Sequence, residues 1–108
     1  MTNINNLTIE DTGIYILFID VAIKRTNGDN DPNFINFRYN VELKTNNILI
    51  IRNVDFVSFK NDFRINFTTI AAINTAGQIL NLNALIAKDN GFSAYFSNIT
   101  AYKIGPLL

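Results

Sequence analysis

Residues 34–44 alternate between apolar and polar side chains more regularly than any other stretch of this chain. Successive side chains of a β-strand point to opposite faces, so the stretch predicts a strand with one face on a core and the other in solvent. The core side would hold Ile35, Phe37, Tyr39, Val41 and Leu43, and the solvent side Asn36, Arg38, Asn40, Glu42 and Lys44. Sheets with one wet face are typical of antiparallel architectures.

Further runs rich in β-branched and aromatic residues follow, separated by polar turn signals. They cover 14–23, 48–59, 63–73 and 92–104. The stretch at 34–44 and the run at 48–59 are close enough to form a hairpin, with its turn at 44–47. The alternation of the second run breaks near Arg52 and Asn53, which predicts a bulge or a bend there.

Residues 75–90 admit two readings. Ile79, Leu82 and Ile86 would share one face of a helix, and Thr75 to Gln78 fit a helix N-terminus. As a strand, Leu80, Leu82, Ala84 and Ile86 share one side. Asn81 and Asn83 form helices poorly and suit the wet side of a strand, so the strand is favoured, with a hairpin turn at 74–77.

A chain of 108 residues is expected to form a single domain over 1–108. The pattern of runs and turns predicts an all-β fold, an antiparallel β-sandwich of jelly-roll-like form with six to eight strands. Residues 1–9 are expected to be an N-terminal arm that supplies at most a short strand over 7–9.

The run at 14–23 differs from the others because both of its sides are apolar. A strand buried on both faces lies in a doubly covered sheet or at a subunit contact. In so small a domain this predicts self-association. The candidate contact residues are Tyr15, Leu17, Phe18, Ile19, Leu107 and Leu108, the last two from the apolar C-terminal tail.

Asp20 is the exception within this apolar run. A buried carboxylate must be paired or hydrogen-bonded, and the mid-strand cations Arg52 and Arg64 are its candidate partners. We therefore predict a buried ion pair that joins Asp20 to Arg52 or Arg64. The competing interpretations are an acid in a pocket and a side chain that points at solvent.

The composition excludes several classes of chemistry. The sequence has no histidine and no cysteine, which rules out imidazole acid–base catalysis, Ser-His-Asp triads and Cys- or His-ligated metals. No glycine motif for phosphate or dinucleotide binding is present, so neither a cofactor nor a metal is expected. Of the acids within strands, Asp20, Glu42 and Asp55 are expected to be solvated or paired, and no enzymatic activity is predicted.

Charge and hydropathy limit the partners. The formal net charge is zero and the cations are dispersed, so nucleic acid is not an expected partner. The N-terminus lacks the features of a signal peptide, and no apolar run is long enough to span a membrane. We expect a protein made in a cytoplasm that stays there or enters a virion.

Six runs carry a resemblance to a known group. They are IYILFIDVAI, FINFRYNVEL, ILIIRNVDFVSF, FRINFTTIAAI, QILNLNALIA and FSAYFSNITAYKI, and they cover residues 14–104. The chain is Asn-rich and lacks Cys, His and Trp, and its predicted fold is compact and all-β. In these features it resembles small β-sandwich or jelly-roll structural proteins of bacteriophage and other viral capsids, of the vertex (penton) or decoration type. The resemblance implies an assembly role and carries over no individual functional residue.

The expected function is therefore that of a structural assembly protein, a virion component at a capsid vertex, a minor capsid protein or a decoration protein. Its partners would be copies of itself and other structural proteins. The alternative is a small ligand-binding β-module for carbohydrate or peptide that uses the loops around 24–33 and 88–91. Asp29, Asn30, Asp31 and Asn33 place oxygen donors in the first loop, although they lack the order of a calcium-binding loop.

Overall fold

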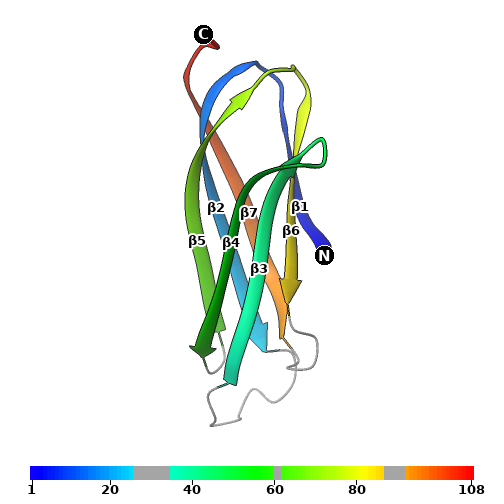
Figure 1. Cartoon of the computed structure of the whole chain (residues 1–108), viewed down its shortest axis with the longest axis vertical. Coiled ribbons are helices and arrows are strands. Elements are labelled where there is room, and N and C mark those ends of the chain that lie inside the picture. The colour runs from blue at the N-terminus through cyan, green and yellow to red at the C-terminus, as the bar shows by residue number, and fades with distance from the viewer. Residues whose placement is uncertain (26–34, 60–61, 87–91) are drawn as a thin grey trace.

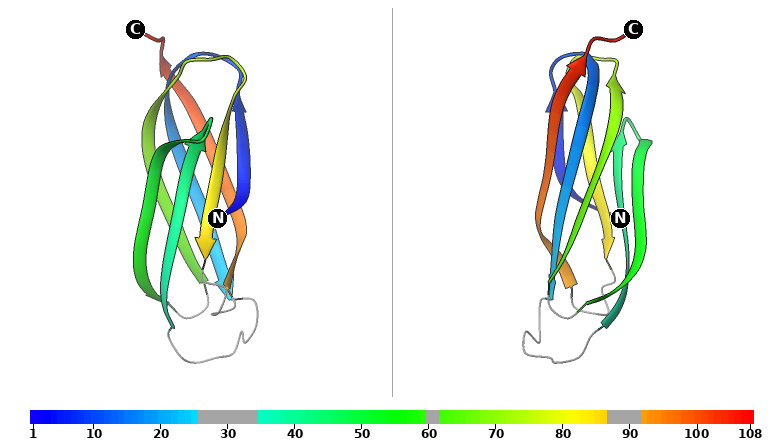
Figure 2. Two further views of the ribbon diagram at one scale, coloured as in Figure 1. Left: turned by 45° about the vertical axis from the view of Figure 1, so that its right-hand side comes forward. Right: turned by 90° about the vertical axis from the view of Figure 1, so that its left-hand side faces the viewer.

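The computed structural model describes residues 1–25, 35–59, 62–86 and 92–108. This part of the chain forms seven strands and no helix (Figure 1), and Figure 2 shows that the strands form two layers. The strands are β1 (Thr2–Ile9), β2 (Gly13–Arg25), β3 (Ile35–Thr45), β4 (Ile48–Phe59), β5 (Asp62–Ile73), β6 (Gln78–Ile86) and β7 (Phe92–Gly105). The predicted all-β sandwich is confirmed.

The sheets are antiparallel throughout, with order β1-β6-β3-β4 in one and β5-β2-β7 in the other. The first six strands pair in a nested way: first with sixth, second with fifth, third with fourth. A ribbon of strands that is doubled over and rolled up pairs in this manner, which is the principle of a jelly roll. Strand β7 then adds to the free side of β2.

The core lies between the two sheets and follows the predicted alternation. The odd side of β2 faces the other sheet, and Leu17, Val21 and Ile23 are fully buried. Val41 and Leu43 of β3 meet it from the opposite layer. The remaining core members are Ile9, Tyr15, Ile19, Tyr39, Ile65, Ile73, Leu80, Leu82, Ala84 and Ile99.

The β3–β4 hairpin is confirmed, but its turn is shorter than expected. Thr45 pairs with Ile48, which leaves Asn46 and Asn47 as a two-residue turn with φ of 51° and 63°. Two central residues at positive φ define the type I′ turn, whose twist matches that of the flanking strands. Asparagine tolerates this left-handed conformation better than most residues.

Two other expectations need correction. The N-terminal arm supplies more than the short strand expected over 7–9, because β1 spans Thr2–Ile9 and pairs along its length with β6. The connection at 74–77 is not a hairpin turn either, because β5 and β6 belong to different sheets. Gln78–Ile86 is a strand, as favoured from its asparagines. In the turn that precedes β6, the Gly77 N–H donates to the Ile9 carbonyl of β1 at 2.8 Å.

The bulge in β4 lies slightly before the predicted position. Leu43 pairs with Ile51 and Lys44 with Leu49, so Ile50 is the extra residue in the ladder. The strand does not change sheets at this point, since the pairing with β3 continues to Phe59.

Candidate functional site

The predicted contact residues of β2 divide between the two faces of the strand. Tyr15, Leu17 and Ile19 are only 7%, 0% and 2% exposed, so they form the core of this chain and are unavailable to a partner. For these three residues the prediction of a subunit contact is wrong. Their side of β2 is covered by the second sheet, whereas Phe18 on the even side is 42% exposed.

The exposed side of β2 continues into an apolar surface on both neighbouring strands. Ile16 pairs with Ile70 of β5 on one side and with Tyr102 of β7 on the other. Ile70 and Tyr102 are 62% and 58% exposed. The rings of Phe18 and Tyr102 pack edge to face, with their centroids 5.9 Å apart. We call this surface the outer apolar patch, made of Ile14, Ile16, Phe18, Ile70 and Tyr102.

The C-terminal residues lie at the same end of the molecule as the patch. Strand β7 runs upward to this end in Figure 1, where the C-terminus also lies. Ile104 is 56% exposed, Leu107 is 37% exposed, and Leu108 is fully exposed. These residues therefore expose further apolar surface around the C-terminal end of β7, which pairs with Ile14 through Gly105.

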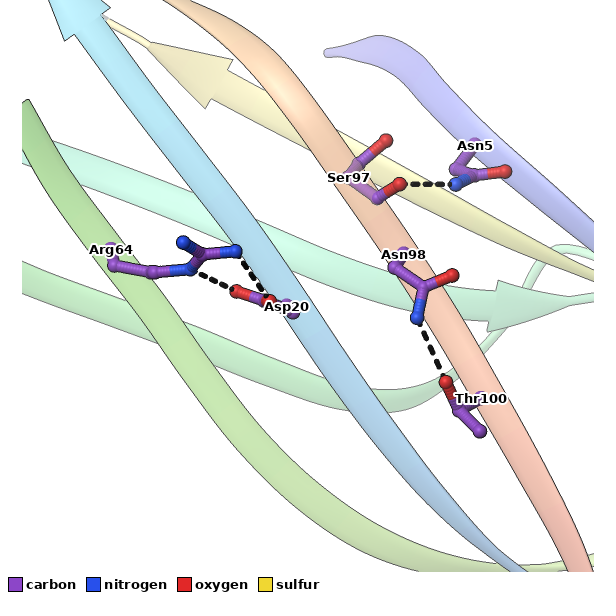
Figure 3. Close-up of polar contacts among 6 residues, drawn as sticks. All are labelled: Asn5, Asp20, Arg64, Ser97, Asn98 and Thr100. Carbon is purple, nitrogen blue, oxygen red and sulfur yellow. Dashed lines mark hydrogen bonds and ion pairs between the residues drawn. The ribbon is translucent and has the colours of Figure 1, made fainter.

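Polar side chains follow the patch along the same three strands. Phe18 is flanked by threonines, and Asp20 by asparagines, in the neighbouring strands. These flanking residues are Thr68, Thr100, Asn66 and Asn98. Asn98 donates to the hydroxyl of Thr100 at 2.8 Å, as Figure 3 shows. The outer face of this sheet is thus apolar at one end and polar in its middle, and Phe96, 44% exposed, follows beyond Asp20.

Asp20 pairs with Arg64 on this outer face. The guanidinium donates from Nε to Oδ1 and from Nη2 to Oδ2, both at 2.9 Å (Figure 3). The Arg64 guanidinium also lies 5.4 Å from the centre of the Phe96 ring. The carboxylate of Asp20 raises the pKa of Arg64 through hydrogen bonding and charge.

The pair is not buried as the sequence predicted, since the side chains of Asp20 and Arg64 are 31% and 55% exposed. The even side of β2 faces outward, so the carboxylate never enters the core. An exposed bidentate pair contributes little to stability. The ion pair neutralises both charges, so this face carries no unpaired charge at that position.

Arg52, the other candidate partner of Asp20, lies in the opposite sheet and pairs with Glu42. Its Nη2 lies 2.7 Å from Glu42 Oε1, and its Nε donates to the same oxygen at 2.9 Å. Lys44 contacts Oε2 at 3.3 Å. Covered by these two side chains, Glu42 is only 4% exposed, although its strand was expected to have a fully wet face.

Burial by itself would raise the pKa of Glu42. The hydrogen bonds and positive charges of Arg52 and Lys44 outweigh this cost and hold the pKa below its ordinary value of 4.5. The carboxylate is therefore ionised and satisfied at neutral pH, which fits a structural role and not that of a general acid.

The outer face of the β1-β6-β3-β4 sheet carries a cluster of amides. The side-chain nitrogen of Asn3 donates to Asn6 Oδ1 at 2.9 Å and to Asn83 Oδ1 at 3.1 Å. At the edge of this sheet, Asn5 donates to the Ser97 carbonyl at 2.8 Å, and Ser97 donates to the Ile4 carbonyl at 3.0 Å. The last two bonds tie β1 to β7 and close that side of the sandwich; Figure 3 shows the one from Asn5 to Ser97.

Two hollows of about 340 and 370 Å³ lie near the β3–β4 turn. Both are lined by amide, hydroxyl and aliphatic groups, without an ionisable side chain among the lining residues. The shared members are Asn46, Thr75 and Gln78. Across the described ranges no three acidic side chains come together in a way that could hold a metal ion.

The loops proposed for the alternative ligand-binding role lie almost entirely outside the described residues. This applies to 26–33, with its oxygen donors Asp29, Asn30, Asp31 and Asn33, and to 88–91. Lys24 at the start of the first loop is exposed at the end of β2. The outer apolar patch is therefore the candidate site that the structure defines best.

Comparison with known proteins adds no family to these observations. No protein-family model matches the chain, and no curated protein is significantly similar to it. In the part of the chain that the structure describes, no helix has the length and apolar character needed to cross a membrane.

Proposed function

We propose that this protein is a structural assembly subunit that associates with copies of itself through the outer apolar patch. The observation that carries the proposal is the continuous apolar row Ile70, Ile16 and Tyr102 across three strands, with Phe18 beside it. Isolated exposed apolar residues are common on protein surfaces, whereas a contiguous patch marks an interaction site.

The size of the patch suits a protein interface. Aromatic side chains carry about 150–250 Å² each. At the exposures given above, the patch and Ile104 together present on the order of 500 Å² of apolar surface, the upper part of the range for monomeric proteins. With the surrounding threonines and asparagines the face approaches the roughly 800 Å² that each partner buries in a standard interface.

A second copy of the chain fits this face better than a charged partner. The patch has no charged side chain, and farther along the same sheet Asp20 and Arg64 neutralise each other. Two such faces can pack as sheets do in a sandwich, about 10 Å apart, with their apolar side chains interdigitated. An isologous contact of this kind needs only one self-complementary surface.

The biological setting that we propose is a virion, as a vertex, minor capsid or decoration protein that also contacts neighbouring structural subunits. The resemblance of the six strand-forming runs to small capsid β-sandwich proteins supports this setting. Identification of the protein by mass spectrometry in purified particles from its source would establish it. Its absence from such particles would remove the virion from the proposal and leave the self-association.

The self-association is tested by light scattering on the purified protein. We expect the wild-type protein to be oligomeric and the Phe18→Asp variant to lose this contact, because a carboxylate would be buried at the centre of the interface. Leu85→Asp is the matched control, since Leu85 is 54% exposed on the outer face of the other sheet. A wild-type protein that stays monomeric at high concentration would refute the proposal, as would equal effects of both variants.

A further inference from the structure

Among the strands that the structure describes, β4 is an edge of the four-stranded sheet and pairs with β3 alone. It is 12 residues long, and its middle carries exposed apolar side chains: Val54 is 50% exposed and Phe56 is 61% exposed. A long edge strand presents a row of backbone N–H and C=O groups that readily pairs with another strand. The opposite edge, β1, differs because side-chain hydrogen bonds tie it to β7.

One hydrogen bond shows which backbone groups of β4 face the open edge. The Phe56 N–H donates to the side chain of Asp55 at 2.7 Å, so it is not part of the ladder with β3. In an antiparallel pair, alternate residues direct their N–H and C=O groups to the same side. Arg52 and Val54 therefore present their backbone groups to the open edge as well.

We propose that β4 pairs with β4 of a second copy of this chain, antiparallel and about a twofold axis through Val54. In this register Val54 lies opposite Val54 of the partner subunit, and the two exchange both backbone hydrogen bonds. Arg52 lies opposite Phe56 of the partner subunit, where its guanidinium can stack on the ring. The two four-stranded sheets then form one continuous sheet.

The inner side of the strand is equally complementary in this register. Ile51 lies opposite Val57 of the partner subunit, and both side chains are half-buried against their own cores. Asn53 lies opposite Asp55 of the partner subunit, so an amide donor meets a carboxylate. The Asp55 carboxylate can accept this bond once the Phe56 N–H has turned from Asp55 to the new strand.

Neighbouring registers are less favourable. A twofold axis at Arg52 or at Asp55 places two like charges opposite each other, which destabilises a strand pair. An axis at Asn53 places Ile51 opposite a carboxylate. The self-complementary sequence around Val54 is the reason that we assign a second copy of the chain, and not an unrelated extended peptide, to this edge.

This contact lies in the other sheet from the outer apolar patch and does not depend on it. Cysteine cross-linking tests it directly, because the chain has no cysteine of its own. Directly opposed residues lie within the Cα separation of about 4.4–6.8 Å that a disulfide needs. Under mild oxidation we expect Val54→Cys to form a disulfide-linked dimer, whereas Ser58→Cys, on the same strand and equally accessible, should stay monomeric.

The register is tested with a mixed pair. Asn53→Cys and Asp55→Cys should cross-link when mixed, because these positions are opposed. Neither should cross-link alone, since each lies about 8 Å from its own copy. Cross-linking of Ser58→Cys as efficient as that of Val54→Cys would show random collision and overturn the proposal, and so would the absence of any Val54→Cys dimer.

A proline variant separates this contact from the one through the patch. Val54→Pro removes an N–H that faces the open edge, which proline tolerates in edge strands, and Val54→Thr keeps it. We expect Val54→Pro to raise the dissociation constant of the β4 contact by about tenfold or more, and Val54→Thr to leave it unchanged.

Amide exchange of Phe56 at rising protein concentration reports the contact in each variant that circular dichroism shows to be folded. If Phe18→Asp abolishes assembly and Val54→Pro does not, the patch is the interface and the edge contact is refuted. If only Val54→Pro abolishes assembly, the edge contact stands and the proposed function through the patch fails. If Val54→Pro unfolds, the cysteine variants decide.

Discussion

Two leucines of β6 provide a sharp test of the fold, because they differ in burial and not in chemistry. Leu82 is fully buried and pairs with Leu43 of β3, whereas Leu85 is 54% exposed. On a strand, positions three residues apart point to opposite faces; on a helix they would share one face. The Leu82→Ala and Leu85→Ala variants therefore distinguish the two readings of residues 75–90.

The expected difference follows from burial. Shortening leucine to alanine at a fully buried site loses roughly 2 kcal/mol of transfer free energy, at about 0.8 kcal/mol per buried methylene. The cavity left behind brings the loss of unfolding free energy to about 3–5 kcal/mol for Leu82→Ala. At Leu85, where half of the side chain is already in solvent, the loss should be about 0.5 kcal/mol.

Urea denaturation monitored by far-UV circular dichroism measures both losses. With a slope of about 1–2 kcal/mol per M, Leu82→Ala should lower the urea midpoint by roughly 2–4 M, and Leu85→Ala by a few tenths of 1 M. Total stabilities of domains are about 5–15 kcal/mol, so Leu82→Ala would remove a large part of the stability. Equal losses for the two variants would refute the register of β6.

Three further perturbations test local features. Arg52 and Lys44 lower the pKa of Glu42 in the folded state. The ionised carboxylate therefore stabilises the fold above the unfolded pKa of 4.5, and this stabilisation is lost as the pH falls below that value. In acid unfolding, the Glu42→Gln variant should lack this pH-dependent loss of stability. Asn47 has φ 63°, so Asn47→Val should lower the free energy of unfolding by about 1–2 kcal/mol, whereas Asn47→Gly should be neutral or stabilising. A valine variant as stable as the wild-type protein would contradict the turn assignment. Gly13→Ala should cost about 1–3 kcal/mol, because Gly13 has φ 154° and an added Cβ would lie 2.8 Å from a carbonyl oxygen of β7; thermal unfolding measures this loss.

The features that could be predicted from the sequence are those determined by local alternation. The two-sided pattern around Tyr39 and Val41 placed β3 correctly, and both residues are buried. Asn81 and Asn83 identified β6 as a strand against a helical alternative. In each case the polar side chains occur at every second position, which a strand accommodates and a helix does not.

The face of β2 that enters the core could not be read from its apolar residues, because both sides are apolar. Tyr15, Leu17 and Ile19 are buried and Phe18 is exposed only because the second sheet covers the odd side. One signal was present in the sequence: Asp20 lies on the even side, and an unpaired carboxylate does not fit a core of aliphatic residues. That signal favours the even side as the outer one, which is where the structure has it.

The partner of Arg52 depends on the bulge at Ile50. Counting back from the two-residue turn without a bulge would place Glu42 opposite Ile51. The extra residue shifts the ladder by one position and brings Arg52 opposite Glu42. Asp20 pairs with Arg64 of β5, the neighbouring strand in the other sheet. A shift of one residue in β4 thus determines the Arg52–Glu42 pair, whereas the Asp20–Arg64 pair follows from the register of β2 with β5, and no local pattern of charges reveals either.

The two contact surfaces inferred for this chain have a combined consequence for assembly. The outer apolar patch lies on the β5-β2-β7 sheet, and the β4 edge belongs to the other sheet. Each contact is isologous and is satisfied by one partner, so a subunit that uses both binds two different copies. Twofold axes that intersect at a right angle close the assembly as a D2 tetramer, axes that intersect at a smaller whole-number division of 180° close it as a larger dihedral assembly, and axes that do not intersect generate an open chain. A single-contact variant, Phe18→Asp or Val54→Pro, would stop at the dimer in each case, so light scattering on the wild-type protein and both variants distinguishes a closed assembly, a growing chain and a simple dimer.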